Sequence, residues 1–141
     1  MLKHLASSVL LISLITLPRT TNAQSAQRLE IDIPFSFVLA GRSLSAGKYV
    51  VERTDPTRPN ILTLTNVDNG IVRLVLTQRV EKDNPGTASS LVFMQRGGKR
   101  YLFQVWNFGA VNGSQIPVLD DKHTSNQRHK ERTLVILRTI H

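Results

Sequence analysis

The clearest pattern in the chain is a strict alternation of apolar and polar residues near its start. From Leu29 to Leu39 the odd positions are Leu, Ile, Ile, Phe, Phe and Leu, and the even positions are Glu, Asp, Pro, Ser and Val. A period of two is typical of a strand with one buried face. Pro34 has no amide proton for a central ladder, so we expect this strand at a sheet edge or with a bulge there.

A second strand is predicted directly after the turn "LSAG". Gly47 ends this turn and tolerates a positive φ, so we interpret the turn as a structural device that joins the first two strands. Alternation resumes from Lys48 to Arg53, with Tyr49 and Val51 predicted on one face.

Two hairpins follow the loop "TDPTRPN". In "ILTLTNVDNGIVRLVLTQRV", a three-residue loop at 68–70 with Gly70 left-handed pairs Leu64 with Leu74 and Leu62 with Leu76. This register keeps the leucines together on one face.

The second hairpin, "LVFMQRGGKRYLFQVW", turns at its two adjacent glycines. The expected register pairs Met94 with Tyr101, Phe93 with Leu102, and Val92 with Phe103. Because both faces are largely apolar, these strands are covered on two sides or line a cavity on one side.

The segment 107–132 is predicted to be a long loop, and loops of this length are usually functional or disordered. The final stretch "TLVILRTIH" alternates again, and we expect it to return and pair with the first strand. The pattern as a whole predicts one all-β domain over 24–141: an antiparallel β-sandwich or partly closed β-barrel of about seven strands.

The first 23 residues have the pattern of a signal peptide. Lys3 and His4 precede an apolar run from Leu5 to Leu17, which is shorter than the roughly 20 residues that span a bilayer. Cleavage after Ala23 is predicted, leaving no stable membrane span. The expected location is therefore the periplasm or the extracellular medium.

Composition excludes some chemistry and favours other kinds. The chain has no cysteine, so thiolate catalysis and thiolate metal sites are excluded, and its net charge of +8 favours anionic partners. Donors for a metal are few: "DDKH" at 120–123, His129 and His141. Their spacing does not match a zinc site, so we expect a solvated loop, no metal and no cofactor.

No catalytic constellation is recognisable in the sequence. No serine lies in a G-x-S-x-G elbow, and Ser114 is interpreted as part of a loop. Glu30 and Asp32 alternate with the apolar stripe and are expected in solvent rather than in a cleft. We therefore predict a protein that is not an enzyme.

Three stretches together resemble a family of small, uncharacterised exported proteins of environmental bacteria. Its pattern is "IPF.F", "LPAG.Y" and "LVF.RYGD.YFL..VW", against "IPFSF", "LSAGKY" and "LVFMQRGGKRYLFQVW" in this chain. The resemblance implies export and an all-β fold, but no activity. Ser45 replaces the usual proline and Gly98 the usual aspartate, which leaves the hairpin tip more basic.

The second hairpin holds both candidate sites. Arg96, Lys99 and Arg100 at its tip favour an anionic surface or glycan as partner. Nucleic acid is disfavoured, because the tip does not match an RNA-binding motif and export removes the protein from most nucleic acid.

The alternative function is a carrier of a small apolar ligand. Tyr101, Phe103 and Trp106 would then line a cavity, where the polar tips of Tyr101 and Trp106 would orient the ligand. The other possibility is that these aromatic residues fill the core. The effect of added salt on binding distinguishes the two predicted functions, since only binding to a charged surface weakens steeply as salt is added. The sequence indicates neither the partner's identity nor an oligomeric state.

Overall fold

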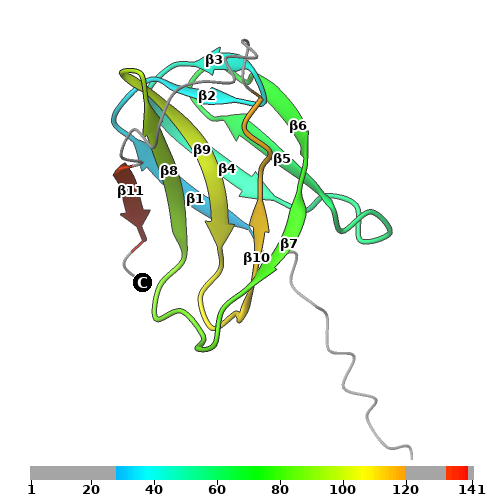
Figure 1. Ribbon diagram of the computed structural model, residues 1–141. Helices are drawn as coiled ribbons and strands as arrows, with labels where there is room; N and C mark the ends of the chain where they lie inside the picture. Colours follow the sequence, from blue (N-terminus) through cyan, green and yellow to red (C-terminus); the bar gives the residue numbers. More distant parts are fainter. Residues whose placement is uncertain (1–27, 120–132, 140–141) are drawn as a thin grey trace, which may run out of the picture.

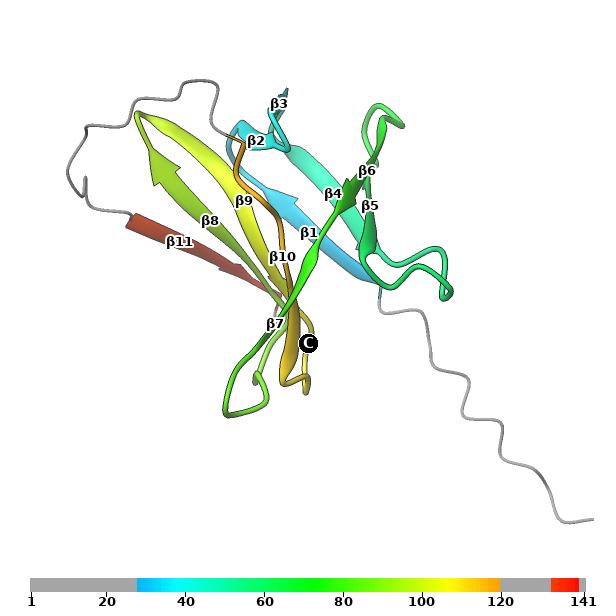
Figure 2. The ribbon, with the colours of Figure 1, turned by 45° about the vertical axis from the view of Figure 1, so that its right-hand side comes forward.

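The computed structural model describes residues 28–119 and 133–139, which form eleven strands and no helix. Two sheets face each other as a sandwich (Figures 1 and 2). The all-β antiparallel fold is therefore confirmed, and the sandwich rather than the barrel is formed. The predicted signal peptide at 1–23 lies outside the described residues.

The first sheet has four antiparallel strands in the order β1 (Leu29–Ile33), β4 (Gly47–Glu52), β5 (Ile61–Asn66) and β6 (Val72–Leu76). The second has the order β11 (Thr133–Arg138), β8 (Ser90–Arg96), β9 (Lys99–Trp106), β10 (Asn112–Gln115) and β7 (Gln78–Glu81). The short strands β2 (Phe37–Leu39) and β3 (Arg42–Leu44) extend the second sheet, where Val38 pairs with Tyr101 in parallel.

The alternating stretch at the start forms two strands rather than the single one predicted. It breaks at Pro34, so that β1 lies at an edge of the first sheet and β2 joins the second. The proline lacks the amide proton that a continuous ladder would need at this point. The predicted edge position is therefore right, but the strand length is wrong.

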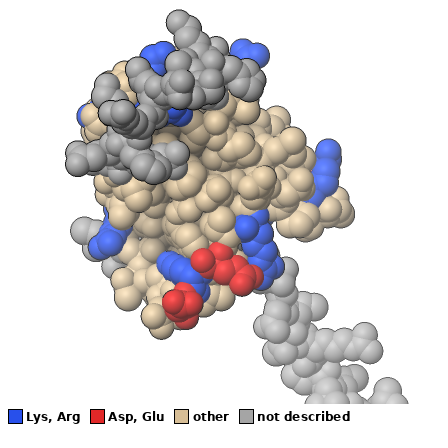
Figure 3. Space-filling model, viewed as in Figure 1, with Lys and Arg blue, Asp and Glu red and all other residues tan. Residues whose placement is uncertain are grey.

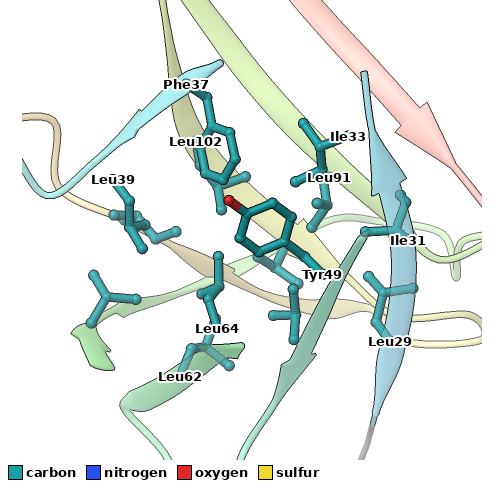
Figure 4. Packing of buried hydrophobic residues seen from close by; sticks show 14 of the residues in the cluster. Leu29, Ile31, Ile33, Phe37, Leu39, Tyr49, Leu62, Leu64, Leu91 and Leu102 are labelled. Carbon is teal, nitrogen blue, oxygen red and sulfur yellow. The ribbon is translucent and has the colours of Figure 1, made fainter. Parts of the chain in front are cut away.

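The core lies between the sheets and contains the inward side chains of both (Figure 4). Phe37 of β2 contacts Tyr49 of β4 and Phe93 of β8 edge-to-face, with ring centroids 5.3 and 5.5 Å apart. Leu91 and Phe93 are fully buried. Tyr49 and Val51 share the inner face as predicted, and the Tyr49 hydroxyl donates to the Ser45 carbonyl at 2.7 Å.

The turn before β4 is structural, as predicted, although it joins β3 to β4 rather than the first two strands. Gly47 has φ +150°, and a Cβ there would lie 2.5 Å from the Asp68 carboxylate. The same carboxylate accepts the Lys48 amide proton at 3.1 Å. Glycine is required because the turn packs directly against the β5–β6 turn.

The predicted register of the β5–β6 hairpin is wrong by one residue. Leu64 pairs with Arg73 and Leu62 with Val75, so that Leu74 and Leu76 are exposed. The Asn66 amide donates to the Ile71 carbonyl, which leaves four residues in the turn instead of three. Gly70 is left-handed as predicted, with φ +71°. One residue of slip moves a whole strand face from core to solvent.

The register of the β8–β9 hairpin is right near the tip and wrong beyond it. Met94 pairs with Tyr101 and Phe93 with Leu102, as predicted. A bulge then shifts the ladder, and Val92 pairs with Gln104 instead of Phe103. A bulge places two residues of one strand opposite one residue of the other.

The chain after β9 also differs from the prediction. The segment 107–132 is not one continuous loop, because β10 lies within it and pairs with both β7 and β9. The last strand, β11, pairs with β8 and not with β1. Eleven strands replace the expected seven because several are short and change sheet, as where β6 passes into β7 at Thr77 (Figure 2).

Candidate functional site

The β8–β9 hairpin brings the three predicted aromatic residues and two of the three predicted cations to one side of the second sheet. Its residues Leu102 and Val105 point into the core and are 1% and 4% exposed. Tyr101, Phe103 and Trp106 are half-buried and lie outside the core cluster. We call the side of the second sheet that faces away from the core the outer face, and these three aromatic residues lie on it.

The basic tip of the hairpin continues this outer face. Arg96 and Lys99 pair across a two-residue turn at 97–98, where both glycines have positive φ. Both cations are exposed. Side chains two residues apart on a strand share a face, so Arg96 follows Met94 and Lys99 precedes Tyr101 on the outer face.

Arg100 differs from the other two cations of the tip. Its guanidinium lies over the Phe35 ring, 4.4 Å from the centroid, and that ring packs edge-to-face on Phe93 at 5.1 Å. The Arg100 Nε is buried without a hydrogen-bond partner among the described residues. Arg100 therefore covers the end of the core, and only two of the three predicted cations extend outward.

Trp106 marks the opposite end of the outer face. A Cβ on Gly113 of β10 would lie 2.7 Å from the indole, so glycine lets the ring lie against the sheet. Lys82 Nζ lies over the same ring, 4.5 Å from the centroid. This second cation comes from the loop after β7, and nothing in the local sequence around it indicates a contact with Trp106.

A chain of hydrogen bonds fixes the polar side chains between the two ends. The Trp106 indole N–H donates to Gln104 Oε1 at 3.1 Å, and Gln104 Nε2 donates to Gln115 Oε1 at 3.0 Å. Such a network holds each side chain in one orientation. The sequence analysis missed both glutamines, although Gln104 alternates with Trp106 on the same strand.

The neighbouring strands extend the outer face with apolar side chains. Val92 and Met94 of β8 are 6% exposed, whereas Leu134 and Ile136 of β11 are 52% and 47% exposed. Leu134 pairs with Met94 and Ile136 with Val92. The aromatic residues of β9 therefore lie beside an apolar surface that is open at its β11 margin.

Charge is distributed unequally over the molecule. Ion pairs among the described residues join Arg28 to Glu52, Lys48 to Glu30, Arg58 to Asp55 and Arg79 to Glu81, and none of these four includes Lys99. Figure 3 views the second sheet's side of the molecule, where a broad uncharged area is bordered by Lys and Arg and, along its lower edge, by Asp and Glu as well. A bound anion would meet cations at that border.

Two pKa shifts arise away from the outer face. The Thr57 hydroxyl and then the Arg58 guanidinium hold the pKa of Asp55 at about 2. Burial lowers the pKa of Arg53, whose guanidinium donates to Ser114 Oγ at 2.6 Å. Ser114 was predicted in a loop, but it is buried on β10 and accepts this bond between the sheets.

The predicted carrier residues do not line the hollow found between two edge strands of the described residues. An open hollow of about 700 Å³ lies between the edges of β1 and β11. Its walls include Glu30, Asp32 and Lys48 on one side and 137–139 on the other, and none of the three aromatic residues belongs to them. Glu30 and Asp32 are exposed, as the alternation predicted.

The described part of the chain holds no group of three or more histidine or acidic residues that could bind a metal ion, and no helix long and apolar enough to cross a membrane. The donors at 120–123, His129 and His141 lie outside the described residues.

Comparison with known proteins assigns no relative. No family model, no curated protein and no solved structure matches this chain. The resemblance to a family of exported proteins accordingly stays a prediction, and the outer face has to be interpreted from its own residues.

Proposed function

We propose that this protein is an exported, non-catalytic binding module that holds an anionic glycan against the outer face of the second sheet. The observation that carries this proposal is the placement of two predicted cations and the three predicted aromatic residues on one face of the β8–β9 hairpin. Arg96 and Lys99 form its basic end, and Tyr101, Phe103 and Trp106 follow along β9. Cations attract the anionic groups, and aromatic rings offer flat apolar surface to sugar rings.

The position of Lys99 supports electrostatic attraction at the tip. Lys99 is exposed, and no carboxylate of the described residues forms an ion pair with it. An exposed cation without an acidic partner keeps its field available to a ligand, although salt screens that field within about 10 Å at 0.1 M.

A carrier of small apolar ligands has less support. Such a carrier needs an internal space, but the inner faces of both sheets are filled by the core, where Leu91 and Phe93 are 0% exposed. The three aromatic residues that would contact the guest lie on the outer face instead. They suit a ligand that lies on the sheet.

The first test is binding of the purified exported protein to dextran sulfate and to uncharged dextran. We expect binding to dextran sulfate that weakens steeply with added salt. Lys99→Glu should lower the affinity roughly tenfold at low salt, which corresponds to ~1.4 kcal/mol. The matched control is Arg28→Glu, which makes the same charge change on the first sheet and should alter affinity much less.

Three outcomes would overturn the proposal. Binding that is insensitive to salt would exclude an electrostatic contact. Equal losses of affinity for Lys99→Glu and Arg28→Glu would show that the tip is not the binding site. Binding to anionic phospholipid vesicles without binding to dextran sulfate would replace the glycan by a membrane surface.

A further inference from the structure

Cations lie at both ends of the aromatic stretch of β9. Arg96 and Lys99 lie at the tip, and Lys82 lies over Trp106 at the other end. Because of the bulge, the stretch from Lys99 to Trp106 is as long as the six residue steps from Arg96 to Ser90 on β8, which span about 20 Å at about 3.3 Å per step. A single small anion cannot contact both ends of such a stretch at once.

The stretch between the cations is uncharged and rich in flat or amide side chains. Tyr101 and Phe103 are half-buried aromatic residues, and Gln104 and Gln115 are linked at 3.0 Å. At the bulge, Phe103 and Gln104 both lie opposite Val92, so the strand carries an aromatic group and an amide group side by side. Amides donate to and accept from hydroxyl groups, and polyphosphate carries no sugar hydroxyl groups.

The environment of Lys82 indicates that Trp106 positions it. The indole lies on Gly113 on one side, and Lys82 Nζ lies 4.5 Å from the ring centroid. A cation over an aromatic ring is held there by the ring quadrupole. The backbone of Lys82 is tied as well, because its amide donates to the Val111 carbonyl at 2.9 Å.

From these observations we infer the ligand class: a linear anionic polysaccharide that lies lengthwise along β9. Its anionic groups contact Lys99 and Arg96 at one end and Lys82 at the other, and its sugar rings lie over Tyr101 and Phe103. This inference rests on the proposed function and adds a second anionic contact, a direction and a minimum length. Lys82 is the anion-binding residue of the far end, and Trp106 is its positioning residue.

The experiment measures affinity for a length series of sulfated dextran oligosaccharides, with polyphosphate and uncharged dextran as comparison polymers. We expect affinity to rise until the oligosaccharide spans about 20 Å and to change little beyond that length. Lys82→Gln should abolish the rise, because the anionic contact at the far end is then lost. Lys48→Gln, on the first sheet, is the matched control and should keep the rise.

The aromatic contacts are tested by a second pair of variants. Phe103→Ala should weaken dextran sulfate binding several-fold and leave polyphosphate binding unchanged, because polyphosphate has no sugar rings. Phe108→Ala is the control, since Phe108 is 62% exposed and lies beyond the end of β9. Thermal unfolding of each variant identifies any that fails to fold, and Phe103→Leu then replaces Phe103→Ala.

The two proposals fail in different ways. If no anionic polymer binds, the proposed function itself is wrong. If polyphosphate binds as tightly as dextran sulfate, and Lys82→Gln retains the length dependence, the tip binds anions but the polysaccharide does not lie along β9.

Discussion

The two long hairpins of this sandwich differ in how their outer faces are covered. In β8–β9 both faces are packed: Phe93 and Leu102 are 0% and 1% exposed in the core, and Val92 and Met94 are 6% exposed on the outer face. In β5–β6 the outer face of β6 is open, and Leu74 and Leu76 on it are 68% and 63% exposed. The difference in exposure follows from the position of the strands in their sheets. β8 and β9 have a neighbouring strand on each side, whereas β6 is an edge strand.

A single inward-pointing charge protects the edge strand β6 against pairing with another chain. The side chain of Arg73 lies on the inner side of the strand, opposite Leu64, and its guanidinium donates to the Val72 carbonyl at 3.0 Å. Inward-pointing charges on edge strands are a known protection against pairing with another chain. The opposite edge, β1, instead carries Glu30 and Asp32 on its outer side. Both hairpins carry apolar side chains on their outer faces, and they differ in how far neighbouring side chains bury them.

The largest expected effect separates a buried from an exposed apolar side chain in the two hairpins. Phe93→Ala should lower the free energy of unfolding by about 3–5 kcal/mol, because the ring is fully buried between Phe35 and Phe37. Leu76→Ala should change it by less than about 0.5 kcal/mol. Urea unfolding followed by circular dichroism measures both.

Comparable losses for the two variants would contradict this prediction, since they would mean that β6 is covered in solution. Where Phe93→Ala does not fold, Phe93→Leu keeps the comparison measurable, with a smaller loss expected from its larger remaining side chain.

The two hairpins also show which parts of the fold could be predicted from sequence. The adjacent glycines at 97–98 set the β8–β9 turn, and the pairs next to it were predicted correctly. In β5–β6 the leucine pattern favoured pairing Leu64 with Leu74, but the turn formed by Asn66 decides the register. Periodicity identifies a strand, whereas a side chain that bonds to turn amides fixes its partner.

The candidate site was predictable only in its local part. The exposed cations of the tip and the aromatic residues of β9 are visible in the sequence, but their common face depends on the bulge near Phe103. The contact of Lys82 with Trp106 depends on β10 lying between β7 and β9, and the exposed Leu134 depends on β11 pairing with β8. These are pairings between distant segments, which no local pattern specifies.

The second prediction tests whether Asn66 fixes the register of β5–β6. Its buried side chain accepts the amide protons of Asp68 and Asn69 at 2.9 and 3.1 Å. Asn66→Ala should lower the free energy of unfolding by about 1–2 kcal/mol, because two turn amides lose their acceptor. Chemical unfolding measures the loss.

Asn69→Ala is the matched variant in the same turn. Asn69 accepts only the exposed Ile71 amide, at 3.0 Å, and water can replace that acceptor, so a smaller loss is expected. Equal losses for the two variants would show that the left-handed Gly70 rather than Asn66 determines the turn.

The smallest effect on stability is expected from a charge placed on the exposed side of β6. Backbone bonds link Asn66 to Ile71 and Asn60 to Thr77, so the antiparallel alternation directs the backbone groups of Leu74 away from β5. Leu74→Lys should change the free energy of unfolding by less than about 0.5 kcal/mol, since the side chain already lies in solvent. It should nevertheless raise the protein concentration at which light scattering detects self-association, because a charge on a free apolar edge opposes pairing with another chain. A large loss of stability without any change in scattering would mean that Leu74 is buried in solution, and the two hairpins would then be covered alike.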